Sequence, residues 1–375
     1  MSNIKNRKIK VMNRNSNLEL LRIISMVMIV TLHIITQGGL IFSINPLSFS
    51  YAVMELFQAI SYVSVNCYVL ISGYFLINSK FKFSKIFKIW LQVLFYSISI
   101  YIILLILNKI PFNLKELIRS MFPLTFGQYW FATVYIILYI ASPILNTIMR
   151  TMSEAQVRLW IFVMILLFSI SPIKDSIGVQ DGYSLYWFIC LYCVGAYIRL
   201  YYKPKYIYKK YLFGFIFATG IDYILAMTSV WITVRLFGVA RGMSYFLAYN
   251  WIGTFIASVC LFIFILNLEV KSQKVNKYIL SFSTLTFGVY LIHVNPHLSK
   301  VIWNEILVTN RYLEYRGKFF IYMLMVISLY LVCSFIEYIR QRVFNNIYNI
   351  IFSSKLVNKI LSLRILLKLK SLFNY

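Results

Sequence analysis

The chain has 375 residues, of which 61% are hydrophobic, 18% aromatic and only 13% charged, with a net charge of +26. This composition excludes a set of soluble domains and indicates a protein that crosses a lipid bilayer several times. The positive charge does not indicate nucleic acid as a partner, because the basic residues fall mostly in short segments between apolar stretches. The five cysteines lie inside apolar stretches, and their odd number predicts no disulfide framework.

Apolar windows predict an all-α polytopic membrane protein with about ten transmembrane helices. The windows lie near 18–37, 53–77, 86–108, 129–148, 158–173, 184–202, 211–232, 246–268, 280–297 and 318–339. Residues 1–17 form a basic tail, and residues 340–375 mix basic and apolar side chains, as an amphipathic helix on the inner leaflet does. If both termini are cytoplasmic, most of the 37 Lys and Arg residues lie on the cytoplasmic side, which is the usual orientation. The predicted domain limits are therefore 1–17, 18–339 and 340–375.

The first span, 18–37, carries ionisable side chains that membrane helices usually exclude. Arg22 and His33 are eleven positions apart, which in a helix puts them about 20° apart in azimuth and about 16 Å apart along the axis. Glu19 lies on the same side, one turn before Arg22. Taken singly, Arg22 could reach the headgroups and His33 could bond to a neighbouring helix. Together they predict a polar track along one face of the helix.

Three later segments also carry informative residues. Ser72 and Gly73 end the second span and predict close helix packing. Trp130 opens the fourth span within a Tyr-Trp-Phe sequence, which an aromatic belt at the membrane boundary also explains. The ninth span begins with serines and threonines and continues through Tyr290 to His293, which alone is more often a packed histidine. Pro296 ends this span.

These segments together resemble the integral-membrane acyltransferase family 3. The shared features are an arginine and a histidine separated by ten residues, an SGYFL sequence followed by basic residues, a Tyr-Trp pair, and a late Tyr-Leu-Ile-His at 290–293. Many members carry Arg-x-x-Arg after the second helix, whereas this chain has Lys85 and Lys88. The lysines keep the positive charge but lack the planar fork of arginine.

The resemblance implies a stand-alone O-acyltransferase of the bacterial cell membrane. Its acetyl donor would be cytosolic acetyl-CoA, and its acceptor a hydroxyl of a capsule, an exopolysaccharide or a lipid-linked precursor. We hypothesise that Arg22, Lys85 and Lys88 bind the CoA phosphates. His33 would act as general base or transient acyl carrier, with Glu55 as the group that orients its ring.

Supporting roles are expected for six further residues: Glu19, Ser72, Gly73, Trp130, Tyr290 and His293. No metal ion is expected, and the partners are the lipid bilayer and a carbohydrate, with the oligomeric state left open. The alternative is a polysaccharide exporter of the same membrane family, in which His33 is a gate or a proton relay. Dependence on acyl-CoA separates the two hypotheses.

Overall fold

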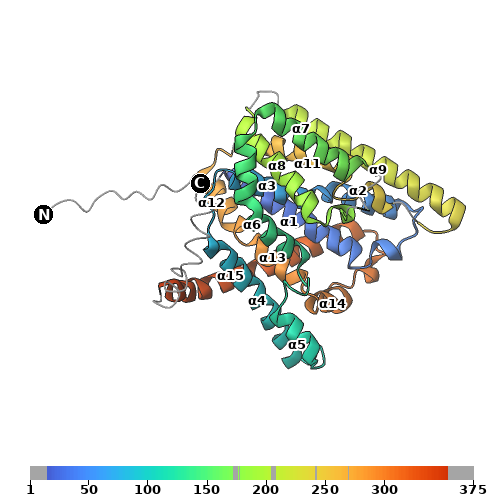
Figure 1. The fold of residues 1–375 in the computed structure, drawn as a ribbon. Helices are drawn as coiled ribbons and strands as arrows, with labels where there is room; N and C mark the ends of the chain where they lie inside the picture. Colours follow the sequence, from blue (N-terminus) through green and yellow to red (C-terminus); the bar gives the residue numbers. More distant parts are fainter. Residues whose placement is uncertain are drawn as a thin grey trace.

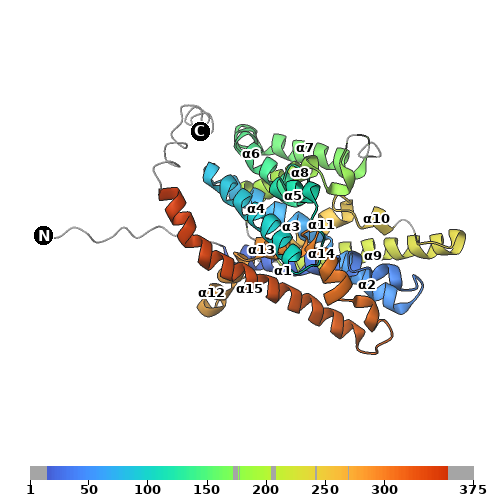
Figure 2. The ribbon, with the colours of Figure 1, turned by 90° about the horizontal axis from the view of Figure 1, so that it is seen from below.

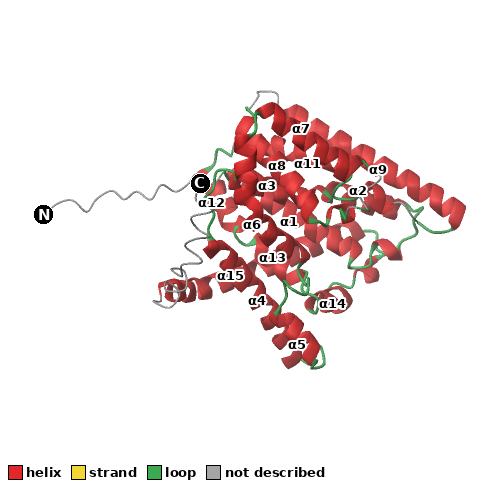
Figure 3. Ribbon diagram, in the orientation of Figure 1, coloured by secondary structure: helices red, strands yellow, loops and turns green. Residues whose placement is uncertain are grey.

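The computed structural model describes residues 15–171, 176, 178–203, 208–240, 243–268 and 270–353. Within these residues every regular element is helical, which confirms the all-α prediction (Figure 3). The longer helices are α1 (Ser16–Thr36), α2 (Phe49–Ser61), α3 (Val63–Leu76), α4 (Phe83–Ile106), α6 (Trp130–Thr151), α7 (Glu154–Ile165), α8 (Leu185–Tyr201), α9 (Lys209–Phe237), α11 (Ile252–Leu266), α12 (Gln273–Ser283) and α15 (Lys318–Ser353). The shorter ones are η1 (Ile41–Ser43), α5 (Leu114–Met121), η2 (Leu166–Ile170), η4 (Gln180–Gly182), α10 (Met243–Phe246), α13 (Thr286–His293), α14 (Leu298–Val301), η5 (Ile302–Ile306) and η6 (Thr309–Tyr312).

Fewer helices than expected are long enough to cross a membrane. Among the described residues six helical stretches qualify by length and composition, or up to seven if a bent pair counts as one span. The expected span at 158–173 holds the 12-residue helix α7 followed by a short π-helix. Those at 184–202 and 246–268 hold helices of 17 and 15 residues. The structure therefore does not confirm ten spans, because several apolar windows are shared between a short helix and a loop.

Helix α1 lies at the centre of the bundle (Figure 1). It contacts α2, α3, α11, α12, α13 and α15, and ten of its 21 residues are buried. The side chain of Asn15 caps its start by accepting a hydrogen bond from the amide of Asn17. By contrast, α4, α6, α9 and α15 have at most a third of their apolar windows buried, so they face lipid. Of the ionisable side chains on α1, Glu19 is buried, and Arg22 and His33 are partly buried.

Glycines let α3 and α8 approach each other closely. A methyl group on Gly73 would overlap the backbone carbonyl of Tyr192, and one on Gly195 would overlap the carbonyl of Leu70. The two backbones therefore touch at small residues, as is common between membrane helices. This contact confirms the packing interpretation of Gly73. Helix α3 also contacts α1.

The ninth predicted span is interrupted. The stretch Gln273–His293 and the stretch Leu298–Tyr312 meet at an angle of 83°. Between them, Asn295 is fully buried, and its side-chain oxygen accepts hydrogen bonds from the amides of His297 and Leu298, while its Nδ2 donates to the hydroxyl of Tyr129. This break ends α13 at His293 inside the bundle, and Figure 2 shows α14 turned away from the line of α13.

Hydrogen bonds between helix ends define two ends of the bundle. At the near end, where α1 begins, Asn17 bonds to the backbone at the end of α11, and Arg150 at the end of α6 donates to the carbonyl of Ile77. At the far end, where α1 finishes, the indole of Trp303 donates to Gln37. In the predicted basic tail at 1–17, residues 1–14 lie outside the described residues. In the predicted tail at 340–375, residues 354–375 lie outside them.

Candidate active site

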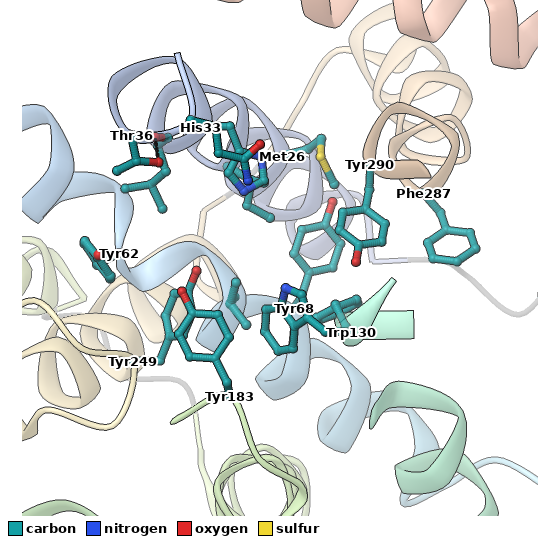
Figure 4. A pocket seen from close by; sticks show the side chains of 15 residues that line it. Met26, His33, Thr36, Tyr62, Tyr68, Trp130, Tyr183, Tyr249, Phe287 and Tyr290 are labelled. Atoms are coloured by element: carbon teal, nitrogen blue, oxygen red, sulfur yellow. Dashed lines mark hydrogen bonds between the residues drawn. The ribbon is translucent and has the colours of Figure 1, made fainter. Parts of the chain in front are cut away.

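A cavity of about 260 Å³ lies along α1 (Figure 4). On α1 its lining runs from Met26 to Gln37, which is about 16 Å of helix. None of the lining residues is Asp, Glu, Lys or Arg, so the polar side-chain groups of this cavity are hydroxyls, the His33 ring, the Gln37 amide and the Trp130 indole. Most of the remaining wall is aromatic, from residues Tyr62, Tyr68, Trp130, Phe131, Tyr183, Tyr249, Phe287 and Tyr290.

Two histidines form a hydrogen-bonded pair at this cavity. Nδ1 of His33 lies 2.9 Å from Nε2 of His293, and Nδ1 of His293 lies 2.6 Å from the carbonyl oxygen of Val289. A carbonyl only accepts, so Nδ1 of His293 carries a proton and its Nε2 accepts from Nδ1–H of His33 when both rings are neutral. The remaining nitrogen, Nε2 of His33, has no hydrogen-bond partner among the described residues. The pair therefore presents an unshared electron pair on Nε2 of His33.

The interrupted helix explains why His293 can reach His33. His293 is the last residue of α13, and its side chain bonds to the carbonyl one turn earlier in the same helix. Its ring is fully buried, whereas His33 is only partly buried and lines the cavity. His293 is thus held in the protein interior while His33 faces the space where a substrate could lie.

The aromatic wall is built around a turn with unusual backbone angles. Gln180 and Asp181 both have φ near +50°, a conformation that non-glycine residues seldom adopt. The next positions place the ring of Tyr183 4.6 Å from that of Trp130 and 4.9 Å from that of Tyr249. The carbonyl of Asp181 also accepts from the amide of Tyr249. Strain of this kind is often retained where it positions functional side chains.

A cluster of positive charge lies on the near-end side of the cavity. Arg22 pairs with the buried carboxylate of Glu19 at 3.0 Å and keeps 28% of its side chain exposed. Its backbone carbonyl accepts from the hydroxyl of Tyr68, which lines the cavity. Arg22 and Lys82 are charged neighbours of Lys85. The structure therefore brings Arg22 and Lys85 together, one turn of α1 away from the first cavity-lining residue.

Lys85 and Lys88 are both exposed on the first turns of α4. Nζ of Lys85 lies 5.7 Å from the centre of the Tyr139 ring, beside the cavity helix α6. Lys82, which no sequence signal had singled out, continues the cluster because its amide donates to the hydroxyl of Tyr139. Arg22, Lys82 and Lys85 therefore form a group of neighbouring cations at this end.

Glu55 does not orient His33 in this structure. Glu55 is fully buried on α2, where its carboxylate accepts from Nε2 of Gln58, and it does not line the cavity. Nδ1 of His33 bonds to His293 instead. The short connection between α1 and α2 suggested Glu55 as the hydrogen-bond partner of His33. In the structure this partner is His293, which lies 260 positions after His33 in the chain.

The other expected residues divide into cavity and packing positions. Trp130 and Tyr290 line the cavity. The hydroxyl of Ser72 donates to the carbonyl of Tyr68, and Gly73 contacts α8. Both residues therefore make contacts within or between helices and do not line the cavity. Tyr68, Tyr183 and Tyr249 also line the cavity, but nothing in the sequence distinguishes them among 30 tyrosines. Within the described part of the chain, no group of three His, Cys, Asp or Glu residues could hold a metal ion.

Comparison with known proteins gives one match. A family model described as an acyltransferase domain matches residues 15–338, which includes both histidines of the pair and the arginine of the charged cluster. No curated protein and no solved structure matched the chain.

Proposed function

Because the chain belongs to acyltransferase family 3, we propose that it is a membrane-bound O-acyltransferase that moves an acetyl group from acetyl-CoA to a carbohydrate hydroxyl. The single observation that carries this proposal is the His33–His293 pair on a cavity whose near-end side adjoins a cluster of positive charge. A base at one position and cations about 16 Å away suit a long donor with phosphates at one end and a thioester at the other.

In this proposal the donor enters from the near end. Arg22 and Lys85 bind the CoA phosphates, with Lys82 and Lys88 adding positive charge at the same end of α4. The pantetheine arm then extends past Tyr68 along the cavity, so that the thioester reaches His33. The apolar and aromatic lining suits an uncharged arm and excludes water from the reacting carbonyl.

His33 acts as the general base. Its Nε2 takes the proton of the acceptor hydroxyl while the hydroxyl oxygen bonds to the thioester carbonyl carbon. The tetrahedral adduct then expels the CoA sulfur, which receives that proton back from His33. His293 keeps the ring in the tautomer with a bare Nε2 and accepts from Nδ1–H, which stabilises the imidazolium that forms in between.

A carbohydrate acceptor is supported by the chemistry of the wall. Aromatic rings with hydroxyls and no charged side chain suit a neutral, polyhydroxylated ring better than a charged or purely apolar acceptor. Tyr183 and Gln37 are the most exposed residues of the cavity lining, and Gln37 lies at the far end of the bundle. We call this exposed part of the cavity the far mouth, and the acceptor would meet these two residues first.

The test uses purified protein in liposomes, labelled acetyl-CoA and a surface glycan. His33→Ala is expected to lower transfer by about 10²- to 10⁴-fold, because it removes the base. The matched control is His297→Ala, since His297 lies outside the cavity next to Glu116 and should leave transfer within about twofold of wild type.

Two outcomes would contradict the proposal. Equal transfer by His33→Ala and wild type would remove His33 from the chemistry. Passage of unmodified glycan through wild-type liposomes under an ion gradient, without consumption of acetyl-CoA, would indicate the exporter instead.

A further inference from the structure

Tyr290 carries a buried hydroxyl without an acceptor. Its side chain is 5% exposed, and among the described residues its hydroxyl has no hydrogen-bond acceptor. It lines the same cavity as His33 (Figure 4). The centre of its ring lies 6.5 Å from the centre of the His293 ring, in an edge-to-face arrangement. A buried polar group left unpaired in a native protein requires an explanation.

The groups beside the Tyr290 oxygen are donors. They are the backbone amides of Phe131 and Ala132, in the first turn of α6. No side chain caps this helix end, because its N-cap residue, Tyr129, makes no capping hydrogen bond. Amides only donate, so these groups cannot accept the phenol proton, and the hydroxyl makes no hydrogen bond to any described residue. The space that remains for this proton is the cavity.

The position at the start of α6 strengthens this donor. The first turn of a helix carries about +0.5 of an elementary charge, which favours negative charge on a nearby oxygen. The positive charge at this helix start polarises the Tyr290 phenol beside it and makes its hydroxyl a stronger proton donor. In a cavity without charged side chains, such a donor acts at low dielectric, where it is strongest.

We propose that the Tyr290 hydroxyl, supported by the first turn of α6, stabilises the oxyanion of acyl transfer. The proposal rests on the acyltransferase function proposed above. As the acceptor oxygen bonds to the thioester carbonyl carbon, the electron pair of the C=O double bond moves onto the carbonyl oxygen, which accepts from the Tyr290 O–H. When the C–S bond breaks, that pair returns to re-form the carbonyl, and Tyr290 keeps its proton throughout. Tyr290 thus complements His33, which handles the proton of the acceptor.

The experiment compares two variants that each delete one buried hydroxyl. Tyr290→Phe keeps the ring and removes the proposed donor. Tyr330→Phe is the matched control, because Tyr330 is also buried and its hydroxyl also has no acceptor among the described residues, but it lies on α15 outside the cavity. Both are assayed as full chains in liposomes for kcat and KM, with affinity for acetyl-CoA measured separately.

We expect Tyr290→Phe to lower kcat by about 10²- to 10³-fold, with the KM and affinity for acetyl-CoA close to wild type, because the donor acts only in the transition state. Tyr330→Phe should remain within about twofold of wild type. Equal loss in both variants would show a structural effect and overturn the assignment. A raised KM with unchanged kcat in Tyr290→Phe would also overturn it, since the hydroxyl would then bind the ground state.

The result separates this inference from the proposed function. If wild type and Tyr290→Phe transfer acetyl equally well, the acyltransferase stands and the oxyanion site is wrong. If wild type does not consume acetyl-CoA, the proposed function is wrong and the inference falls with it.

Discussion

At the scale of single residues, the hydrogen bonds of His293 predict a positioning role that acts through His33. Its Nε2 accepts from Nδ1–H of His33, and its own Nδ1 donates to the carbonyl of Val289. Neither nitrogen is left to contact a substrate. Loss of His293 should therefore affect how well the base works rather than whether the donor binds.

We expect His293→Ala to lower kcat on the order of 10²-fold with little change in the KM for acetyl-CoA. His293→Gln should recover part of this loss, because its amide oxygen can accept from Nδ1–H of His33 at a similar reach. The measurement is steady-state kinetics beside thermal unfolding of each variant. Failure of glutamine to improve on alanine, at equal thermal stability, would exclude the acceptor role.

Sequence reasoning located one half of this pair. The spacing of Arg22 and His33 predicts a shared helix face, and the structure places the cavity on the face that carries His33, with Arg22 one turn beyond its edge. The partner of His33 could not be derived in the same way. Glu55 is near in sequence but bonds to Gln58, whereas His293 reaches His33 only because the bundle brings α13 against α1.

At the scale of elements, the contact of α3 with α8 holds the wall of the cavity. Gly73 of α3 and Gly195 of α8 lie where the two helices touch. A methyl group on either would overlap the backbone of the other helix, and a backbone shift costs more free energy than a side-chain rotation. The aromatic residue Tyr68 projects into the cavity from α3. A change in helix separation would therefore shift the cavity wall as well as lower stability.

We expect Gly73→Ala to destabilise the protein by about 1 to 3 kcal/mol, because the methyl group overpacks the α3–α8 contact. Gly220→Ala is the control: Gly220 lies in α9 with no atom within 4 Å of the added methyl group, so helix propensity should make it neutral or slightly stabilising. Thermal unfolding in one detergent, followed by tryptophan fluorescence, measures both. Equal melting temperatures would mean that α3 and α8 are not in close contact.

Element boundaries show what hydrophobicity can and cannot predict. Each of the ten apolar windows contains at least part of a described helix, because burial in lipid or protein selects the same residues. Windows cannot distinguish a spanning helix from a short helix preceded by an apolar loop, as at 246–268. The break after His293 has a sequence signal in Pro296, but its 83° angle depends on the buried bonds of Asn295.

At the scale of the whole molecule, the arrangement predicts on which side each substrate arrives. The near end carries the basic cluster and most of the loops rich in Lys, whereas the far end carries the exposed Tyr183. Basic loops favour the cytoplasmic side of a membrane. We therefore expect the donor cluster to face the cytoplasm and the far mouth to face outward.

Two cysteine variants test this orientation. Lys80→Cys lies at the near end and Phe42→Cys at the far end, where Phe42 is 79% exposed. A maleimide that cannot cross membranes should label Phe42→Cys on intact cells and Lys80→Cys only after permeabilisation. Wild type is the background, since four of its five cysteines are buried. The reverse pattern would place acetyl-CoA and the basic cluster on opposite sides of the membrane.

The histidine content of the chain has a spectroscopic consequence. Only three of 375 residues are histidines, and two of them form the pair at the cavity. A sample labelled with ¹⁵N only at histidine therefore gives ring signals from the four nitrogens of the pair and from one further imidazole, that of His297. The ¹⁵N chemical shift distinguishes a protonated from a bare ring nitrogen, so the direction of the His33–His293 hydrogen bond can be read from the resting protein, without substrate and without mutation.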